Sequence, residues 1–564
     1  MGIAAHANES SKYTFVLTAD TYDEYNKLKE IYSLVPFCEN YAGLSFLYNK
    51  YDFPFIVSEL DKIGLKNRRI DKKLYESIKS LHNITPLKIH PDLQARIKRE
   101  VKPFQVEAIE RMSGSPFYLL GDLMGLGKTS SALLTVMNLL AYGKASSAVI
   151  VATASSLGKW SDECSKIFGK KHGIDIVVAD GGKEQRAQIF RDEHQITVIN
   201  LESLARDYKQ LMKYNKFKRF ISNSIIVVDE AHRIKNYDTL NHKSVYALGN
   251  MALRKYALTG TPMDGKLTSI YGIFRFLHQP LFGKFSSFDK FHIKRDFFGG
   301  IDSFKNVDIV EKKAKPFILR RRKEEVLGSF PSIVEKDYII PMTAAEQKIY
   351  KKLEKSEIQE LYDSKLISED ARIDPDMEIS IFSACCQWCD CPGLVDPQWK
   401  QVGSKMKALD EILEQVIEGG NKVVVFTKFK MMLDILSKYL KYDMCLLYGS
   451  MSSKERKESM DEFLANPDKK VFLMTTAGKE SIDLHGTEID GKWVDGANYL
   501  IMYDSMMNPA VNEQITGRID RIGQQKSMTV IRLFSKGTIE ETDVRDTILK
   551  RMKINKAVLE GAGL

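Results

Sequence analysis

The stretch FYLLGDLMGLGKTSSALL, Phe117 to Leu134, decides the fold of the first large domain. FYLL is predicted to be a buried strand, GDLMGLGK a glycine-rich loop, and TSSALLTVMNLL a helix. This order directs loop N–H groups and a helix N-terminus toward phosphate oxygens. The strict phosphate-loop rule asks for Gly, four residues, then Gly-Lys-Ser/Thr, and Asp122 stands where the first glycine belongs. The stretch is therefore either a nucleotide site with an altered first position or a structural glycine turn.

Short apolar runs repeat along the chain in two series. After FYLL come AVIVAT, ITVIN, SIIVVDEA and KYALTG, and a second series contains KVVVFT, MCLLYG, KVFLMTT, NYLIMYD and MTVIRLF. Continuous apolar runs of this kind are typical of strands that are buried on both faces of a parallel sheet. We therefore predict an α/β protein with two parallel sheets and ligand chemistry at the strand ends.

Changes in the sequence pattern along the chain predict the domain boundaries. Alternating and helical patterns between Lys12 and Lys62 predict a small α/β unit before the first series. The predicted domains are a small N-terminal accessory domain (1–92), a first lobe (93–325), a helical insertion or linker (326–410) and a second lobe (411–564).

Bulk composition narrows the classes of function. The 564 residues carry a net charge of +9, which favours a polyanionic partner, although charges of both signs are mixed. No apolar run reaches the roughly 18 residues that a membrane-spanning helix needs, and the start lacks a signal pattern. We expect an intracellular protein without a membrane partner.

Four of the seven cysteines cluster at Cys385, Cys386, Cys389 and Cys391. Cys386 and Cys389 have the spacing of zinc ligands, but no second pair completes the usual set of four. The cluster is either a zinc site or a group of buried, reduced thiols.

A second motif supports nucleotide binding by the glycine loop. SIIVVDEAHRIKN is an apolar strand that ends in Asp229 and Glu230. Lys128 is expected to reach the outer phosphates of ATP, and Thr129 and Asp229 are expected to hold Mg²⁺. Glu230 is the expected base for the attacking water.

These motifs resemble those of the Swi/Snf-type double-stranded-DNA translocases in helicase superfamily two, and the compact chain resembles their HepA-related branch. The family carries aspartate where the strict rule has its first glycine, which accounts for Asp122; Leu123 departs from the family's acidic residue. The resemblance implies two RecA-like lobes that form an ATP cleft. YALTGTPMDGK matches the family's coupling motif, with Thr259, Gly260 and Thr261 between the ATP and DNA sites, and KPFILRRRKEEV resembles the segment that ends the first lobe.

The resemblance also implies roles for further residues. KPFQVEAIE matches the adenine-reading segment, and NEQITGRIDRIGQQ is similar to the arginine motif, in which Arg518 and Arg521 are predicted to share one helix face. Both arginines are expected to act on the γ-phosphate. The expected nucleotide contacts are Gln105, Gly125, Leu126, Gly127, Lys128, Thr129, Asp229 and Gln514.

Several segments are similar to the family's strand-contact motifs. The expected nucleic-acid contacts are Thr153, Ser155, Lys159, Trp160, Asn200, Lys235, Asn236, Thr427, Lys428, Gly449, Arg456 and Thr475. Lys479 and Ser481 replace glycines of the family in one second-lobe motif, and Met507 replaces its usual tryptophan.

The resemblance implies an ATP- and Mg²⁺-dependent, monomeric motor that translocates on double-stranded DNA and remodels branched DNA or protein–DNA complexes. Two alternatives stay open: a strand-separating helicase, although no wedge hairpin is evident in the sequence, and a non-enzymatic ATP-gated DNA clamp. The N-terminal domain is either a DNA-binding domain or a packing domain.

Overall fold

The computed structural model describes residues 2–559 apart from 33, 34, 36, 37, 67, 124, 264, 298, 328–331, 369, 372, 374–377, 477–481, 490, 491 and 522. The chain forms two compact units: unit 1 holds Met1–Leu123, Gly127–Arg322 and Ile554–Leu564, and unit 2 holds Met124–Leu126 and Lys323–Lys553. Within the described residues, no helix combines the length and apolarity that crossing a bilayer demands.

Unit 1 begins with the N-terminal domain, whose sheet has the strand order β3-β4-β2-β1-β5. Its elements are β1 (Ile3–Ala7), β2 (Thr14–Ala19), α1 (Tyr22–Tyr32), β3 (Cys38–Tyr41), β4 (Ser45–Asn49), η1 (Lys50–Asp52), α2 (Phe53–Lys62), β5 (Arg68–Ile70) and α3 (Lys72–His82). Phe46 and Tyr48 are fully buried in its core, whereas Tyr22 is exposed.

The N-terminal domain packs against the rest of unit 1 through η1 and the last residue of β4. The Asn49 side chain donates to the carbonyl oxygen of Pro280 (2.6 Å), and the Tyr51 hydroxyl lies 3.0 Å from Nε2 of His278. Asp52 forms a buried ion pair with Lys313. These contacts attach the N-terminal domain to the rest of unit 1.

The first lobe is built on a parallel sheet with the order β14-β6-β11-β10-β7-β9-β8. Its strands are β6 (Phe117–Leu120), β7 (Ser147–Ala152), β8 (Ile176–Ala179), β9 (Ile196–Asn200), β10 (Ser224–Val228), β11 (Arg254–Leu258) and β14 (Ile318–Leu319). Its helices are α4 (Pro91–Arg96), α5 (Pro103–Gly114), α6 (Lys128–Ala141), α7 (Leu157–Phe168), α8 (Lys183–Asp192), α9 (Leu201–Leu211), α10 (Asn215–Ser222), α11 (Leu240–Gly249), α12 (Leu267–His278), α13 (Phe285–His292) and α14 (Val307–Ala314).

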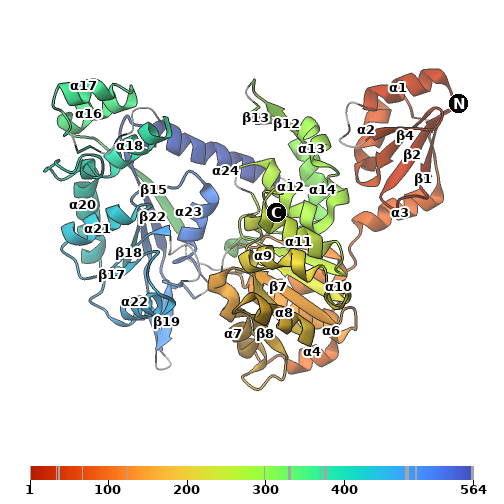
Figure 1. Ribbon diagram of the computed structural model, residues 1–564, viewed down its shortest axis with the longest axis horizontal. Coiled ribbons are helices and arrows are strands. Elements are labelled where there is room, and N and C mark those ends of the chain that lie inside the picture. Colours follow the sequence, from red (N-terminus) through yellow and green to blue (C-terminus); the bar gives the residue numbers. More distant parts are fainter. Residues whose placement is uncertain are drawn as a thin grey trace. The chain divides into compact units, whose positions relative to one another are not determined.

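Both faces of this sheet are buried under helices (Figure 1). Successive residues of a strand point to opposite faces, so Val149 and Val151 of β7 join one core cluster, while Ala148 and Ile150 join the other. This explains why the strands read as unbroken apolar runs, and it leaves the carboxyl edge of the sheet for polar chemistry.

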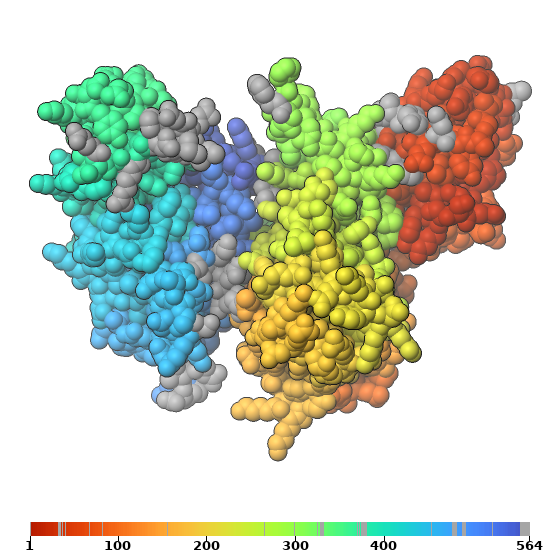
Figure 2. Space-filling view, viewed as in Figure 1, coloured from red at the N-terminus to blue at the C-terminus, as the bar shows by residue number. Residues whose placement is uncertain are grey.

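A hairpin of β12 (Ile293–Arg295) and β13 (Ile301–Phe304) stands out from the surface of unit 1 (Figures 1 and 2). Phe297, in the turn between the strands, is 97% exposed. No pattern in the sequence predicted this hairpin.

Unit 2 contains a second parallel sheet with the order β15-β22-β21-β16-β18-β17. Its strands are β15 (Ile333–Ile340), β16 (Val423–Phe426), β17 (Met444–Leu447), β18 (Val471–Met474), β21 (Tyr499–Met502) and β22 (Met528–Ser535), with a separate hairpin of β19 (Gly486–Ile489) and β20 (Lys492–Asp495). Its helices are α15 (Lys323–Leu327), α16 (Ala344–Glu354), α17 (Ile358–Asp363), α18 (Glu378–Asp390), α19 (Pro392–Val395), α20 (Ser404–Glu418), α21 (Lys430–Tyr439), α22 (Ser453–Ala465), α23 (Pro509–Thr516), the π-helical turn η7 (Glu540–Val544) and α24 (Arg545–Leu559). The predicted helical region 326–410 contains α16 to α19 and the start of α20, but β15, a long edge strand of the sheet, also lies within it.

Candidate active site

The glycine loop joins β6 to α6 at the carboxyl edge of the first sheet. Gly125 and Gly127 have φ values of +89° and +75°, a left-handed conformation that favours glycine. Leu126, between them, is buried. A Cβ at Gly127 would lie 2.5 Å from Nε2 of Gln105, so the predicted adenine-reading side chain lies directly against the loop.

Lys128 is the first residue of α6, and its ammonium folds back over the loop. Nζ donates to the carbonyl oxygens of Asp122 (2.7 Å) and Leu123 (3.3 Å). Thr129 follows in the first helical turn and is half-buried. A lysine held by loop carbonyls can exchange them for phosphate oxygens, which is the role that the sequence predicted for it.

Asp122 stands in place of the missing glycine and binds an arginine. Its carboxylate accepts a bidentate pair of hydrogen bonds from Arg321, at 3.1 Å from Nε and 2.6 Å from Nη2. Arg321 also donates to the carbonyl oxygen of Phe104 (2.7 Å) and to Glu107 (2.9 Å) on α5. The pair therefore ties the glycine loop to the segment that carries Gln105. Sequence reasoning matched KPFILRRRKEEV to the end of the first lobe but predicted no role for this arginine.

Asp229 and Glu230 follow β10 at the same edge of the sheet. The Asp229 N–H donates to the carbonyl oxygen of Val151 (2.8 Å), and its Oδ1 accepts from the N–H of Glu230 (2.9 Å). Glu230 has a φ of +48°, an unfavourable conformation for a non-glycine residue and one that often marks functional sites. Burial, and then the charge of Glu230, raises the pKa of Asp229 to about 7, while the nearby ammonium of Lys128 opposes this rise.

His232 links Glu230 to the predicted coupling motif. Its Nδ1 lies 3.2 Å from a carboxylate oxygen of Glu230 and 3.4 Å from the hydroxyl of Thr259. Thr259 is fully buried at the end of β11, and its hydroxyl accepts from the N–H of Thr261 (3.1 Å). His232 therefore connects Glu230 with Thr259.

Thr129 and Asp229 carry the ligand groups that suit a magnesium ion bound with ATP. A threonine hydroxyl and a carboxylate are the hard oxygen ligands that Mg²⁺ prefers, usually completed by water and substrate phosphates. Burial and the charge of Glu230 raise the pKa of Asp229, and a divalent cation bound beside it would favour the ionised carboxylate.

We expect Asp229→Asn to raise the thermal stability of the nucleotide-free protein at pH 8 and to change it little at pH 4. The pKa of Asp229 is higher in the folded chain than its ordinary value of 3.8, so the wild type loses folding free energy as the pH rises from about 4 to about 7. The asparagine cannot ionise and escapes this loss. Thermal melts across this pH range check it, with Asp192→Asn on the exposed end of α8 as the control. Equal pH slopes in wild type and Asp229→Asn would contradict it.

The nucleic-acid residues predicted in unit 1 lie after β7, at the last residue of β9 and after β10, and both β9 and β10 pair with β7 in the sheet. Lys159 and Asn236 are exposed, and Lys235 is half-buried. Asn200 caps α9 by accepting from the N–H of Ser203 (2.9 Å). The sheet order thus brings these segments to one edge.

Two of these predictions do not fit the structure. Trp160 is fully buried among the core residues between α7 and the sheet, so its ring cannot contact nucleic acid, and its burial is explained by packing. Thr153 is also buried, and its hydroxyl lies 2.9 Å from that of Ser156 in a capping box. The side chain of Ser155 lies outside the described residues.

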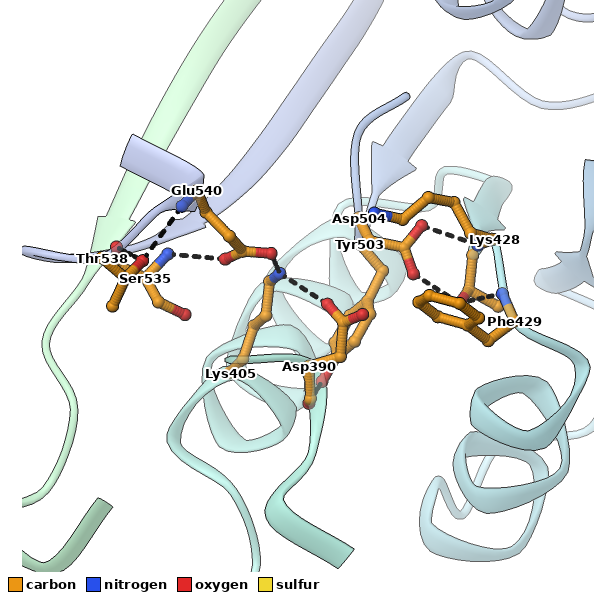
Figure 3. Close-up of polar contacts among 10 residues, drawn as sticks. Asp390, Lys405, Lys428, Phe429, Tyr503, Asp504, Ser535, Thr538 and Glu540 are labelled. Atoms are coloured by element: carbon orange, nitrogen blue, oxygen red, sulfur yellow. Dashed lines mark hydrogen bonds and ion pairs between the residues drawn. The ribbon is translucent and has the colours of Figure 1, made fainter. Parts of the chain in front are cut away.

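In unit 2, Thr427 and Lys428 follow β16 and are held by Asp504. The buried Thr427 hydroxyl donates to Oδ2 of Asp504 (2.7 Å). The Lys428 N–H donates to Oδ1 of Asp504 (2.6 Å) (Figure 3). This corrects the prediction that the Thr427 hydroxyl is a nucleic-acid contact, because the hydroxyl is internal. Burial opposes the charge of Lys428, but Asp504 and Asp390 outweigh it and raise the pKa of the lysine.

A buried charge network continues from Asp390. Nζ of Lys405 lies 2.9 Å from Asp390 and 2.7 Å from Glu540, and all three side chains are almost completely buried (Figure 3). The Tyr503 hydroxyl donates to the carbonyl oxygen of Asp390. The network joins α18, α20 and η7, and no periodic pattern in the sequence indicates it.

The remaining unit 2 predictions lie after β17 and β18, two strands that follow β16 in the sheet order. Gly449 is exposed, and its carbonyl oxygen accepts from Nη2 of Arg456 (2.8 Å). Thr475 is buried. Lys479 and Ser481 lie outside the described residues.

The arginine motif differs from the prediction in its backbone. Gly517 caps the end of α23, so Arg518 and Arg521 follow the helix instead of sharing one of its faces. Arg518 is 2% exposed and donates to the carbonyl oxygens of Ile482 (3.0 Å) and Gln514 (3.1 Å). The side chain of Gln514 is itself buried.

Arg521 is the more accessible of the two arginines. Its side chain is 21% exposed and forms an ion pair with Asp483. The preceding residue, Asp520, binds Lys323 at the start of unit 2 (2.7 Å).

The cysteine cluster is buried in and just after α18. Burial raises the pKa of the thiols of Cys385, Cys386, Cys389 and Cys391, which disfavours the thiolate that binds zinc. In the part of the chain that the structure describes, no group of three or more His, Cys, Asp or Glu side chains is arranged to hold a metal ion.

A glycine loop and an Asp-Glu pair at one edge of a parallel sheet, with a second parallel sheet that carries an arginine motif, define a helicase-like ATPase. Residues 104–387 match the model of the SNF2-related domain, and residues 404–523 match that of the helicase conserved C-terminal domain. The chain belongs to the SNF2-related family.

Two relatives are similar to most of this chain. It is 28% identical over 468 residues to human chromodomain-helicase-DNA-binding protein 1, with 78% of this chain and 26% of that protein covered. It is 25% identical over 505 residues to the ISWI chromatin-remodeling complex ATPase ISW1 of Saccharomyces cerevisiae, with 83% of this chain and 41% of that protein covered. The chain therefore spans less than half the length of these relatives.

Among solved structures, the Sulfolobus solfataricus SWI2/SNF2 ATPase core in complex with dsDNA is 27% identical to this chain. The match covers 83% of this chain and 94% of that one, with a TM-score of 0.38.

Proposed function

We propose that this chain is an ATP- and Mg²⁺-dependent motor that translocates on double-stranded DNA and remodels branched DNA or protein–DNA complexes. The observation that carries the proposal is that Lys128, Asp229 and Glu230 lie at the same sheet edge as the exposed Lys159 and Asn236. Membership of the SNF2-related family supports it, as do the DNA binding and chromatin remodeling in the names of the two relatives. Membership of the HepA-related branch and a monomeric state belong to the same proposal.

In the proposed reaction, the first lobe binds and activates the nucleotide. Gln105 reads the adenine, the glycine loop and Lys128 bind the phosphates, and Glu230 takes a proton from the attacking water. Thr129 and Asp229 would hold Mg²⁺, which when bound would supply positive charge to the phosphates of ATP.

We assign stabilisation of the transition state to Arg521, because Arg518 is buried against backbone carbonyls of its own unit. His232 and Thr259 would transmit a change at Glu230 to the strand-contact segments, because His232 contacts both Glu230 and Thr259.

ATP turnover on a panel of DNA substrates tests the proposal. The panel compares no nucleic acid, single-stranded DNA, duplex DNA and a forked junction, and a triplex-displacement assay detects movement along duplex DNA. Stimulation by duplex or fork, with triplex displacement, is the expected result. Stimulation by single strands alone would overturn it, and an absence of turnover with every substrate would favour the clamp.

The β12–β13 hairpin favours a second candidate, the strand-separating helicase. The exposed ring of Phe297 stands at the turn, and the neighbouring basic side chains are already paired, Arg295 with Asp289 (2.6 Å) and Lys294 with Asp302 (3.0 Å). An aromatic ring in this position can stack on an unpaired base.

For this candidate we expect Phe297→Ala to reduce fork unwinding by at least about 5-fold, because base–aromatic stacking contributes about 1–3 kcal/mol. ATP turnover should stay within about 2-fold, since the hairpin is not part of the nucleotide loop. Strand-displacement assays check it, with Tyr214→Ala as an exposed aromatic control on the same unit. A wild type that translocates without unwinding forks would remove this candidate.

A further inference from the structure

A cavity of about 550 Å³ lies between the N-terminal domain and the first lobe, within unit 1. The N-terminal domain contributes residues of β1, η1 and α3, and the lobe contributes the connection between α5 and β6. That connection precedes β6, whereas the glycine loop follows it, so the cavity and the nucleotide loop lie at opposite ends of one strand. The volume is in the range of small-molecule sites.

The cavity carries an excess of positive charge. Lys12, Lys50 and Lys73 line it, and Glu9 is the acidic side chain among its lining residues. Among the described residues, no carboxylate lies within ion-pair distance of any of these three lysines. Burial lowers the pKa of His278 in the cavity wall to about 3, so this histidine is neutral and adds no charge near pH 7.

Lys50 is the unusual group in this cavity. It is 3% exposed, and Nζ donates to the hydroxyl of Ser77 (3.0 Å), whose own proton goes to the carbonyl oxygen of Leu74 (2.7 Å). An ammonium has three donors, and this hydroxyl uses one of them. Burial, and then the like charge of Lys73, lowers the pKa of Lys50.

Lys313, another buried lysine between the N-terminal domain and the first lobe, has a different partner. Lys313 forms an ion pair with Asp52, which is close to Lys50 in the chain, so this carboxylate is already paired with another lysine. A buried cation without such a partner costs folding free energy unless an anion binds it. An anion bound in the cavity would supply compensating negative charge at Lys50.

Aromatic side chains form another part of the wall. Phe117 stacks on His278 with ring centroids 4.4 Å apart, and Tyr13 meets the same imidazole edge-on at 4.8 Å. A flat, apolar wall in a cavity that also holds a group of lysines suits a molecule with a planar ring at one end and a phosphate at the other.

We propose that this cavity binds a nucleotide, with its phosphate on Lys50 and Lys73 and its base toward Tyr13 and Phe117. The nucleotide is either free in solution or the phosphorylated, unpaired end of a DNA strand. The site is separate from the ATP loop, and it goes beyond the proposed motor activity.

The test uses the full chain and two probes, thymidine 5′-monophosphate in calorimetric titration and a fork with a 5′-phosphorylated single-stranded end in fluorescence anisotropy. Lys50→Met removes the charge and keeps the apolar stem, and Lys73→Met does the same at an exposed position where folding does not depend on the side chain. Lys79→Met, on the same helix as Lys73 but outside the cavity, is the matched control. The Tm of Lys50→Met should be equal to or above that of the wild type.

We expect both cavity variants to weaken binding at least about 10-fold and the control to leave it unchanged. Binding of the monophosphate with this pattern supports a free nucleotide; binding of only the phosphorylated fork, lost with its phosphate, supports a DNA end. Equal binding by wild type and both variants, or no binding of either probe, would overturn the proposal. DNA-stimulated ATP turnover measured on the same samples shows whether the motor proposal fails independently.

Discussion

Glu230→Gln is expected to reduce DNA-stimulated ATP turnover by about 10²–10⁴-fold, the range for the loss of a general base. Glu230 adjoins Asp229 at the end of β10, and its carboxylate contacts Nδ1 of His232. The amide keeps the size of the side chain and one acceptor oxygen but cannot accept a proton from water. Steady-state phosphate release, with and without duplex DNA, measures the loss.

Measuring nucleotide affinity distinguishes the loss of the general base from damage to the glycine loop. The affinity for a fluorescent ATP analogue should change by less than about 3-fold in Glu230→Gln, because Lys128 and the loop hold the phosphates. Glu184→Gln, at an exposed position in the first turn of α8, is the matched control and should behave as the wild type. Turnover within about 2-fold of the wild type in Glu230→Gln would remove Glu230 from the role of base.

The parallel strands were predictable because burial on both faces leaves an unbroken apolar signature. FYLL, AVIVAT and SIIVV correspond to β6, β7 and β10, and the carboxylates follow β10 as predicted. The short edge strands β3 and β5, CENY and RRI, carry no such signature, since an edge strand half-exposed to water needs few apolar residues. β15, another edge strand, was not predicted for the same reason: IVEKDYII mixes apolar and polar residues and lies within a region dominated by helical patterns.

The role of an individual side chain was predictable only where the local backbone conformation allowed it a single direction. The spacing of Arg518 and Arg521 suggested one helix face, but Gly517 ends the helix first. Trp160 lies within a matched motif, yet the amphipathic α7 turns it toward the core.

Ion pairs between distant parts of the chain were not predictable at all. Asp122 with Arg321, and Lys405 with Glu540, leave no periodic signal in the sequence. Only the folded sheets bring these partners together, so the structure was needed to find what holds the glycine loop.

Arg321→Met is expected to cost about 3–5 kcal/mol of unfolding free energy, because it leaves the buried carboxylate of Asp122 without its partner. Glu107 and the Phe104 carbonyl lose a donor as well, so the glycine loop and the Gln105 segment are no longer joined. The affinity for ATP should fall along with stability. Urea unfolding of the full chain and binding of a fluorescent ATP analogue measure the two losses.

A neighbouring arginine provides the matched control for this variant. Arg322 is exposed, and Arg322→Met should stay within about 0.5 kcal/mol of the wild type in the same urea titration. A similar loss in both variants would mean that the effect does not come from the buried pair.

The pH dependence of Arg321→Met distinguishes lost charge compensation from lost packing. Burial already raises the pKa of Asp122 in the wild type, and Arg321 opposes that rise. Without the arginine the folded-state pKa rises further above the unfolded value, so folding free energy is lost as the pH increases, and Arg321→Met should be more destabilised at pH 8 than at pH 5. Adding Asp122→Asn removes the ionisable group and should abolish this extra pH dependence while recovering part of the stability. A destabilisation that is equal at both pH values, and that Asp122→Asn does not relieve, would mean that the arginine contributes packing alone and that Asp122 has no role in holding the loop.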